Sequence, residues 1–448
     1  MKLFGTDGIR GKVNSSPMTP EKVLRLGMAI ASVLRNDHGR NMVLIGKDTR
    51  LSGYMIESAL TSGLCAKGVN VTLVGPLPTP GIAFLTRTLR LDAGIVISAS
   101  HNPYYDNGIK IFSSEGYKIS DELEYKIEQL VADDSFPKRR AQGDKIGKAF
   151  RLDDATGRYI EYVKSTIPRG ADLEGLKILI DCANGASYKA SPALFRELGA
   201  DVTSINDKPD GININEGCGS LYIDKLSDVI VKKGYNLAIA HDGDADRTLL
   251  IDDKGFMVDG DKMLAIFAEY FQKKGLLKNN VVVATTMSNL GLEKRLNSLG
   301  INLVRTRIGD RYVTEEMIRR GANLGGEQSG HIILSDFNTT GDGMITAIQI
   351  LYILKESGVN LSHLASQIRL FPQELINVEC QSRKDFKTIP KVQNVIQEAE
   401  KSLLGIGRLL VRSSGTEPKI RIMVEAEEGD LAKKWANRVA DVIRETVE

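Results

Sequence analysis

The chain has 448 residues, 42% hydrophobic and 26% charged, with a formal net charge of +2. This is the composition of an ordinary globular protein, and the small net charge gives no argument for a nucleic-acid or membrane partner. The four cysteines, Cys65, Cys182, Cys218 and Cys380, show no C-x-x-C spacing and no histidine at zinc spacing, which argues against a disulfide framework or a structural zinc site.

The length predicts several domains at roughly 100–200 residues each. The first residues, Met1 to Gly5, contain no charged segment followed by an apolar core. No apolar run in the chain approaches the roughly 18 residues that a membrane span needs. We therefore expect a cytoplasmic protein.

Short apolar runs alternate with helix-length amphipathic runs through most of the chain. The predicted strands lie at 42–46, 70–75, 93–98, 177–181, 201–205, 236–241, 281–285 and 302–305, and the predicted helices at 53–67, 191–198, 290–299 and after Gly309. This alternation predicts three α/β domains with mixed, largely parallel sheets. Ligands in such domains bind beyond the carboxyl ends of the strands.

The last part of the chain follows another order. Strands are predicted at 374–380, 408–411 and 420–425, with helices at 392–403 and from 430 to the end. Neighbouring strands of this kind predict a smaller α+β domain with an antiparallel sheet and two helices on one face. We place the four domains at 1–153, 154–254, 255–369 and 370–448.

A serine-containing loop follows the predicted strand 93–98. It reads Ser-Ala-Ser-His-Asn-Pro from Ser98 to Pro103, and its Ser100 hydroxyl can carry a phosphoryl group. The alternative is that Ser98 or Ser100 only caps a helix. The G-x-S-x-G pattern of a hydrolase nucleophile is absent here. Lys110, a little downstream, is either a residue that acts on a proton or a phosphate, or a solvated surface lysine.

An aspartate loop, Asp-Gly-Asp-Ala-Asp-Arg, follows the predicted strand 236–241. An EF-hand also begins D-x-D-x-D, but Arg247 and Asp253 occupy the positions where that loop needs glycine and glutamate. In a turn, Asp242, Asp244 and Asp246 can face one cation, and an oxygen-only donor set favours magnesium. Without a cation or Arg247 beside them, the three carboxylates would repel one another.

Two further loops offer ligand-binding groups. The first of them, from Gly325 to His331, reads Gly-Gly-Glu-Gln-Ser-Gly-His, and its Glu327 and Ser329 could bind sugar hydroxyls. The alternative is a glycine-rich turn with no ligand-binding role. The segment Arg412 to Arg421 combines hydroxyls, backbone N–H groups and guanidinium groups, which suits a phosphate. A simple hairpin turn between two strands is the alternative for this segment. The glycine-dense opening, Phe4 to Gly11, is a fifth charged loop.

These motifs, in this order and along the whole chain, resemble the α-D-phosphohexomutases. The opening Phe-Gly-Thr-Asp-Gly-Ile-Arg-Gly, Gln328 in the third loop, and the closing Ser-Gly-Thr-Glu-Pro-Lys-Ile-Arg-Ile-Met-Val-Glu are most similar to the branch that acts on glucosamine phosphates. One departure is Leu221-Tyr222 after Cys218-Gly219-Ser220, where relatives usually have Thr-His. Because this segment lies outside the four loops, we expect it to leave catalysis unaffected.

The resemblance implies four domains around one cleft and a phosphoserine at Ser100. It implies that the Ser100 phosphate, Asp242, Asp244 and Asp246 hold one Mg²⁺, and that Glu327 and Ser329 bind the sugar. The residues implied around the reaction centre are Arg10, His101, Lys110, Arg247 and His331. Those implied for the non-reacting phosphate are Arg412, Ser414, Gly415, Thr416 and Arg421.

The activity that the resemblance implies is interconversion of glucosamine 6-phosphate and glucosamine 1-phosphate through a sugar bisphosphate, in a pathway toward amino-sugar nucleotides and cell-wall precursors. The expected partner is therefore a small hexosamine phosphate, and a homodimer is compatible with the family. Two alternatives stay open: a phosphomannomutase or phosphoglucomutase, and a non-catalytic paralogue that binds sugar phosphates. The second would be expected to lack Ser100 or one of the aspartates, and all four are present.

Overall fold

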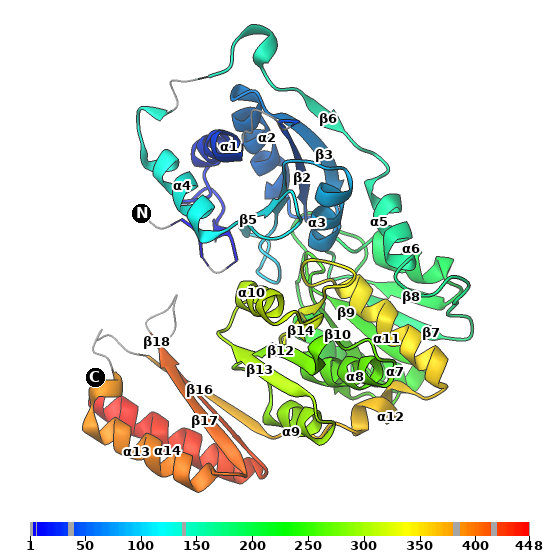
Figure 1. Cartoon of the computed structure of the whole chain (residues 1–448), viewed down its shortest axis with the longest axis vertical. Helices are drawn as coiled ribbons and strands as arrows, with labels where there is room; N and C mark the ends of the chain where they lie inside the picture. The colour runs from blue at the N-terminus through cyan, green and yellow to red at the C-terminus, as the bar shows by residue number, and fades with distance from the viewer. Residues whose placement is uncertain are drawn as a thin grey trace. The chain divides into compact units, whose positions relative to one another are not determined.

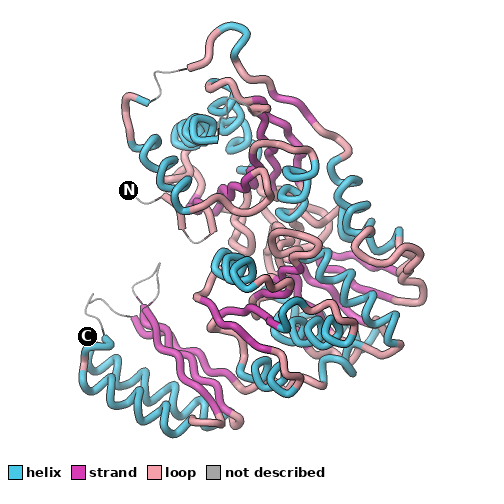
Figure 2. The backbone as a smooth tube through the Cα atoms, in the orientation of Figure 1, coloured by secondary structure: helices cyan, strands magenta, loops and turns pink. Residues whose placement is uncertain are grey.

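The computed structural model describes residues 3–5, 7–34, 40–136, 140–379, 386–413 and 419–447. The chain divides into two compact units (Figures 1 and 2). The first unit contains Met1–Met287 and Ile301–Ser366, and the second contains Ser288–Gly300 and Gln367–Glu448. Among the described residues, no helix has both the length and the apolar character that crossing a membrane requires.

The first sheet carries the serine loop. Its strands are β1 (Ile9–Lys12), β2 (Met42–Lys47), β3 (Asn70–Pro76), β4 (Ala93–Ile97), β5 (Asp106–Ser113) and β6 (Ala149–Arg151). In the order β1-β5-β4-β2-β3-β6, the last four strands are parallel, whereas β5 and β1 join antiparallel. All five residues of β4 are buried, as is typical of a strand covered on both faces.

Helices cover both faces of this sheet (Figure 1). Three of them, α1 (Pro20–Leu34), α2 (Ser52–Ala66) and α4 (Asp121–Ala132), share an apolar core with residues of β2 and β4 such as Ile45 and Ile95. On the opposite face lies α3 (Thr79–Thr88), whose Ile82 packs where a side chain at Gly46 would stand. The α/β architecture expected for the first part of the chain is therefore confirmed.

The second sheet carries the aspartate loop. Its strands are β7 (Lys177–Asp181), β8 (Asp201–Ile205), β9 (Leu237–His241), β10 (Thr248–Ile251) and β11 (Met257–Val258), in the order β11-β10-β9-β7-β8. The first three are parallel, and β10 and β11 are antiparallel additions. The helices around it are α5 (Ala155–Lys164), α6 (Ala190–Glu197) and α7 (Ser227–Lys233).

The third sheet carries the sugar-binding loop predicted from the sequence. Its strands are β12 (Val281–Thr285), β13 (Asn302–Thr306), β14 (Leu324–Gly326) and β15 (Ile332–Leu334), in the order β13-β12-β14-β15. Only the pairing of β14 with β15 is antiparallel. The associated helices are α8 (Gly260–Lys273), α10 (Asp310–Arg320), α11 (Gly343–Ser357) and α12 (Leu361–Ser366).

The second unit has an antiparallel sheet of β16 (Gln373–Glu379), β17 (Gly407–Ser413) and β18 (Lys419–Ala426), with β18 in the middle. Its helices are α9 (Leu290–Ser298), α13 (Pro390–Leu403) and α14 (Gly429–Val447). Apolar residues of α13 and α14, including Trp435, pack with those of the sheet in one core. The predicted α+β domain with two helices on one face is confirmed.

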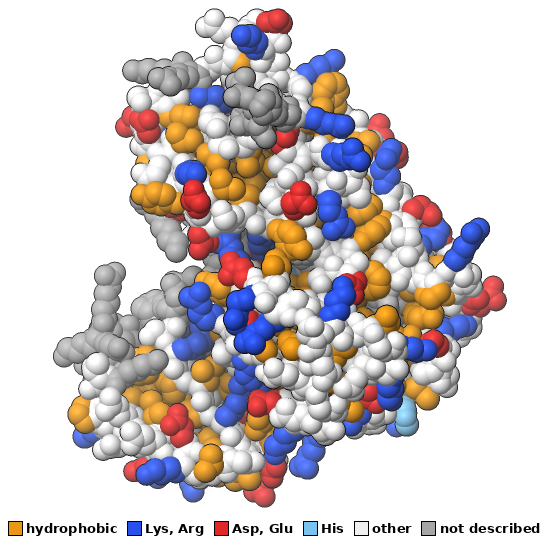
Figure 3. All heavy atoms as spheres, viewed as in Figure 1, with side chains coloured by type: hydrophobic (Ala, Val, Ile, Leu, Met, Phe, Trp, Pro, Cys, Tyr) orange, Lys and Arg blue, Asp and Glu red, His pale blue; other side chains and the backbone are white. Residues whose placement is uncertain are grey.

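Several predicted strands match the observed bounds residue for residue, among them β7, β8 and β12. The sequence did not predict the short antiparallel strands at the sheet edges, nor β5, whose apolar residues are interrupted by Asn107, Gly108 and Lys110. The domain boundaries within the first unit remain a prediction. On the face shown in Figure 3, basic and acidic side chains of the described residues are interspersed, in keeping with the net charge of +2.

Candidate functional site

The serine loop leaves the carboxyl end of β4 in a strained conformation. Ser100 has φ +51° and is 1% exposed. Residues other than glycine seldom adopt this left-handed region, and doing so costs about 1–3 kcal/mol. Within the loop, the Ser100 N–H donates to the Ser98 hydroxyl oxygen at 2.9 Å, and the Ser98 hydroxyl donates to Asp48 at 2.6 Å. The serine is therefore held in place by its neighbours.

Two side chains from distant segments hold the loop from behind. Arg50 is fully buried, and its guanidinium donates to the carbonyl oxygens of Ser100 at 2.9 Å and Asn102 at 2.8 Å. The Asn215 amide donates to the same two oxygens at 2.9 and 3.1 Å. Asp48 in turn accepts from the Arg50 guanidinium at 2.8 Å. These hydrogen bonds offset the strain at Ser100 and fix the direction of its hydroxyl.

Sequence reasoning missed Asn215, and it placed the neighbouring segment outside the functional loops. The Asn215 amide contacts the serine loop, and the Gly219 N–H donates to Asp181 at the end of β7 at 2.8 Å. Leu221 and Tyr222, the departure from the family pattern, are 58% and 43% exposed. Only the part of the segment before them supports the site.

We expect Asn215→Ala to lower kcat about tenfold to a hundredfold, because a misplacement of about 1 Å at a reacting group can cost about a hundredfold. The KM for the sugar should stay nearly constant, since the Asn215 amide donates to the serine loop and lies against Gly243 of the aspartate loop, away from Glu327 and Ser329. Asn213→Ala is the matched control, because the Asn213 amide donates to the Lys208 carbonyl instead. Steady-state kinetics of both variants measure the effect, and equal kcat values for the two would contradict it.

The aspartate loop forms the connection between β9 and β10 and lies against the serine loop. A carboxylate oxygen from each of Asp242, Asp244 and Asp246 lies within 4.8 Å of the other two, and all three residues are buried. The Ser100 hydroxyl donates to Asp242 at 2.5 Å. At Gly243, a Cβ would stand 2.5 Å from the Ser100 carbonyl oxygen, so a side chain there would separate the two loops.

The three aspartates fit a hard divalent cation. Oδ1 of Asp244 and Oδ1 of Asp246 are buried and have no hydrogen-bond partner among the described residues. Burial, together with the charges of Asp246 and Asp244, raises the pKa of Asp242 well above its usual value. Unpaired carboxylate oxygens and mutual repulsion are both relieved when a cation binds. Because the donors are all oxygen, Mg²⁺ is a suitable ion.

Lys110 is neither in a loop nor on the surface. It lies on β5, is 1% exposed, and places Nζ 2.9 Å from Asp244 Oδ2 and 3.0 Å from Asp246 Oδ2. The surface alternative for Lys110 was wrong. Arg247, which the sequence suggested as the counter-charge, approaches only to 3.9 Å of Asp246. The nearer positive charge among the three carboxylates is therefore the buried lysine.

His101 and Arg247 lie beside the serine hydroxyl. Nδ1 of His101 is 3.4 Å from Ser100 Oγ and 3.4 Å from the Arg247 guanidinium. Burial lowers the pKa of His101 to about 4, and the charges of Arg247 and Arg10 act in the same direction. His101 is therefore neutral at neutral pH. Arg10 stands on β1, the edge strand beside β5, and donates to Asp7.

The sugar-binding loop connects β14 to β15 and rests on the strand that leaves the aspartate loop. At Gly330, a Cβ would meet the Thr248 carbonyl oxygen at 2.1 Å, and the Gly330 carbonyl accepts from the Thr248 N–H at 3.1 Å. Glu327 accepts from the Gly309 N–H at 3.2 Å and from the Ser329 hydroxyl at 3.3 Å. The structure thus brings Glu327 and Ser329 into the same unit as Ser100.

His331 ends this loop beside the aspartates. Its ring is buried, with Nε2 4.0 Å from Asp246 Oδ2 and 3.5 Å from Asp310 Oδ2. The Asp310 carboxylate also pairs with Lys118, which pairs in turn with Asp7. Asp310 opens α10, where an acidic residue is ordinary, so the sequence offered no signal to separate it from a helix-end charge.

The predicted phosphate residues belong to the second unit. Ser414, Gly415 and Thr416 lie outside the described residues. Arg412 on β17 and Arg421 on β18 stand directly opposite each other, an arrangement that destabilises a sheet when the charges are alike. Burial lowers the pKa of Arg412, and the charge of Arg421 adds to the effect. An anion bound at this pair would offset the repulsion.

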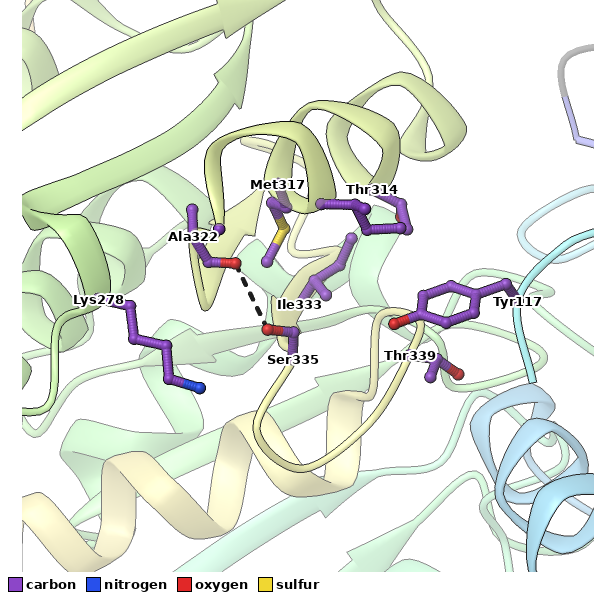
Figure 4. A pocket seen from close by; sticks show the side chains of 10 residues that line it. Tyr117, Lys278, Thr314, Met317, Ala322, Ile333, Ser335 and Thr339 are labelled. Atoms are coloured by element: carbon purple, nitrogen blue, oxygen red, sulfur yellow. Dashed lines mark hydrogen bonds between the residues drawn. The ribbon is translucent and has the colours of Figure 1, made fainter. Parts of the chain in front are cut away.

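A cavity of about 260 Å³ lies between α10 and the turn after β5 (Figure 4). Tyr117, Met317, Ile333 and Thr339 are among its lining residues, and the Ser335 hydroxyl donates across it to the Ala322 carbonyl at 3.5 Å. None of the site residues predicted from the sequence lines this cavity. It is therefore separate from the serine and aspartate loops.

Comparison with known proteins agrees with this arrangement. Four family models match the chain in order: phosphoglucomutase/phosphomannomutase alpha/beta/alpha domain I at residues 1–138, domain II at 157–255, domain III at 259–371, and the C-terminal domain at 375–442. The phosphoglucosamine mutase of Thermodesulfovibrio yellowstonii is 53% identical over 443 residues, covering 97% of each chain. That of Myxococcus xanthus is 52% identical over 442 residues, covering 99% of this chain and 96% of the other.

Solved structures with the same fold extend along the whole chain. A phosphoglucomutase/phosphomannomutase family protein from Burkholderia thailandensis has a TM-score of 0.83 at 23% identity, covering 99% of this chain and 97% of that one. An N-acetylphosphoglucosamine mutase from Aspergillus fumigatus, in complex with GlcNAc-6P and magnesium, has a TM-score of 0.66 at 17% identity, covering 100% and 96%. The chain therefore belongs to the phosphoglucomutase/phosphomannomutase family, the phosphohexomutases, and is an isomerase.

Proposed function

We propose that this chain interconverts glucosamine 6-phosphate and glucosamine 1-phosphate through a phosphorylated Ser100 and a glucosamine bisphosphate. The observation that carries the proposal is the contact of the Ser100 hydroxyl with Asp242, at 2.5 Å, inside a buried aspartate triad. A phosphoryl carrier beside a divalent-cation site is the equipment of phosphoryl transfer. The choice of glucosamine rests on the relatives that match the whole chain.

The reaction has two transfers with the same geometry. In the first, the sugar's free hydroxyl loses its proton and its oxygen attacks the phosphorus on Ser100, the bond from phosphorus to Ser100 Oγ breaks, Oγ takes up a proton, and the bisphosphate forms. The bisphosphate then turns end for end, and Ser100 Oγ takes the phosphoryl group from the other end. The sugar leaves with its phosphate moved, and the enzyme is phosphorylated as before.

The surrounding residues supply position and charge in this proposal. Bound by Asp242, Asp244, Asp246 and the Ser100 phosphate, Mg²⁺ would neutralise charge on the transferred group. Lys110 contributes positive charge at the same place. Burial works against that charge, but Asp244, Asp246 and Asp7 outweigh it and raise the pKa of Lys110 well above its usual value. Arg10, His101, Arg247 and His331 complete the reaction centre.

Two sets of residues would bind the sugar hydroxyls and the non-reacting phosphate of the substrate. Glu327 and Ser329 accept and donate hydrogen bonds at the hydroxyls that lie between the two ends of the sugar, so they can serve both orientations. Arg412, Ser414, Gly415, Thr416 and Arg421 would bind the phosphate that is not reacting. The repulsion between Arg412 and Arg421 supports this role, because a phosphate offsets it.

A cytoplasmic location belongs to the same proposal. The described cysteines, Cys65, Cys182 and Cys218, are all free thiols, as is usual in a reducing compartment.

Relative kcat/KM values on glucosamine, glucose and mannose 6-phosphates test the proposed substrate. We expect a clear preference for glucosamine 6-phosphate with measurable turnover of glucose 6-phosphate. Glu327→Ala should lower kcat/KM on every sugar by a similar factor of about ten to a hundred, because it removes a charged hydrogen-bond acceptor worth about 1.5–3 kcal/mol. Glu315→Ala, an exposed change on α10, is the control. A kcat/KM on mannose 6-phosphate equal to or above that on glucosamine 6-phosphate would overturn the glucosamine assignment and leave the mutase chemistry standing.

A further inference from the structure

The structure contains a carboxylate, Asp310, that contacts the reaction centre and follows directly in sequence on a residue bound by Glu327, the proposed sugar-binding residue. The N–H of Gly309 donates to Glu327 at 3.2 Å, and the next residue is Asp310. On its other side, the Asp310 carboxylate lies 3.5 Å from Nε2 of His331, whose ring lies 4.0 Å from the metal-site residue Asp246. Asp310 is therefore linked to Glu327 through the neighbouring Gly309 N–H and to the aspartate triad through His331.

The Asp310 carboxylate forms an ion pair with the Lys118 ammonium group. The Lys118 ammonium is shared between Asp310 and Asp7, so two carboxylates face one cation. Burial opposes ionisation, but the charge on Lys118 outweighs it, and the pKa of Asp310 lies below its usual value. The side chain of Asp310 is 13% exposed, and its Oδ1 also accepts from the Arg311 N–H at 2.8 Å.

The chemistry of a hexose phosphate decides what this carboxylate would meet. When O1 of the sugar is at Ser100, and a hydroxyl at C3 or C4 is at Glu327, the substituent on C2 lies on the stretch between them. In glucosamine phosphates this substituent is an amino group, which donates hydrogen bonds and becomes a cation when protonated. A carboxylate is the side chain that best accepts from such a group.

His331 adds an independent sign that a ligand belongs here. Its ring is 2% exposed, and neither Nδ1 nor Nε2 has a hydrogen-bond partner among the described residues. Buried ring nitrogens without partners are rare unless a ligand, water or ion supplies one. The stretch between Glu327 and the aspartates thus has unused hydrogen-bonding capacity next to Asp310.

The other polar side chains of the sugar-binding loop are directed elsewhere. The Gln328 amide donates to Asp259 at 3.5 Å, and the Ser329 hydroxyl donates to Glu327. Gln328 marks the glucosamine branch in the sequence, yet its amide nitrogen is directed to the residue that caps α8. Asp310 remains as the carboxylate beside Glu327 that is not a member of the metal triad.

We propose that Asp310 is a specificity-determining residue, which accepts the 2-amino group of the substrate while Lys118 holds its carboxylate in place. The inference rests on the proposed function, because it concerns the sugar that this mutase selects. It assigns the selection to the start of α10 and leaves Glu327 and Ser329 to bind hydroxyls common to several hexoses.

The test is the ratio of kcat/KM on glucosamine 6-phosphate to that on glucose 6-phosphate. Asp310→Asn keeps the size of the side chain and removes its charge. We expect the ratio to fall about tenfold or more, because a site that loses the partner of a charged group discriminates poorly. The value on glucose 6-phosphate should change by less than about threefold on the same argument. Both substrates are measured on one preparation, so any loss of folded enzyme cancels.

Two further variants sharpen the result. Glu316→Gln changes a carboxylate on the same helix that pairs with Arg319 and Arg320, and its ratio should equal that of the wild type. Lys118→Met removes the cation that holds the Asp310 carboxylate in place, so its ratio should also fall, by no more than that of Asp310→Asn. If Asp310→Asn is inactive on both sugars, calorimetric affinities for the two 6-phosphates replace kcat/KM, with the same fall expected in the ratio of affinities.

An unchanged ratio in Asp310→Asn, or an equal fall on both sugars, would overturn the inference. A ratio that is unchanged in Lys118→Met would contradict the positioning role of Lys118. The activity and sugar preference of the wild-type enzyme distinguish a failure of this inference from a failure of the proposed function. A wild-type enzyme without mutase activity, or without preference for glucosamine 6-phosphate, contradicts the proposed function, whereas a preference that survives Asp310→Asn contradicts the role of Asp310 alone.

Discussion

Ser100→Ala is expected to lose at least about a hundredfold in kcat, the loss typical of removing one group that acts in the transition state. The expected loss is larger than this floor, because the hydroxyl is the proposed carrier of the phosphoryl group. In the structure, Ser100 Oγ points to Asp242 at 2.5 Å, and Arg50 and Asn215 fix the backbone behind it. The other serine of the loop cannot replace it, since the Ser98 hydroxyl is committed to Asp48.

Steady-state kinetics and peptide mass spectrometry measure this expectation together. Active wild-type enzyme should carry phosphate on the peptide that contains Ser100, and the alanine variant should carry none there. Ser98→Ala is the matched control: it removes a hydroxyl that supports the loop, so its loss should be smaller and its phosphate should remain on Ser100. Near-native turnover by Ser100→Ala would rule out the phosphoserine mechanism.

Chelation of divalent metal should abolish activity, and added Mg²⁺ should restore it. Asp244→Asn should lower kcat by about a hundredfold or more, in line with the loss of one electrostatic group at a reaction centre, and should raise the Mg²⁺ concentration needed for half-maximal activity. Asp244 occupies a central place, because its Oδ2 accepts from Lys110 at 2.9 Å and from the Thr79 hydroxyl at 2.6 Å. Asparagine keeps the shape and removes one negative charge from the site.

A magnesium titration of activity and a calorimetric titration of Mg²⁺ give the two measurements. Asp228→Asn, which removes an exposed carboxylate on α7, should leave both titrations unchanged. Because every proposed ligand is an oxygen atom, Mg²⁺ and Mn²⁺ should restore activity better than Zn²⁺. Full activity in metal-free buffer, or an unchanged magnesium requirement in Asp244→Asn, would exclude the triad as the metal site.

The expected effects of Ser100→Ala and Asp244→Asn concern one junction in the structure, where the serine loop meets the aspartate loop. Ser100 contacts Asp242, and Gly243 lies against the Ser100 carbonyl, so the proposed phosphoryl carrier and the proposed metal ligands are held at a fixed spacing. Asn215 adds a second tie, because it comes from the domain of the aspartate loop and binds the backbone of the serine loop. A variant at this junction should therefore affect transfer more than sugar binding, which is the pattern expected for Asn215→Ala.

Local sequence determined the order of the elements and the identity of the loops. Buried strands such as β7 and β12 are short, nearly continuous apolar runs between polar ends, so their bounds could be predicted to the residue. Ser100 and the three aspartates could be found because each motif lies within a few consecutive residues after such a strand. The roles of these residues, and the boundaries of the first three domains, remain predictions.

Only the tertiary structure decided which side chains support these loops. Asn215 binds the Ser100 carbonyl across 115 residues, Lys110 reaches Asp244 across 134, and Lys118 reaches Asp310 across 192. Contacts between residues so far apart in the chain produce no periodic pattern in the sequence. From the residues alone, Lys110 could equally be a surface lysine, and Asp310 could not be distinguished from an ordinary charge at a helix start. The cost of burying a charge is offset only by its partners, and those partners come from other domains of the chain.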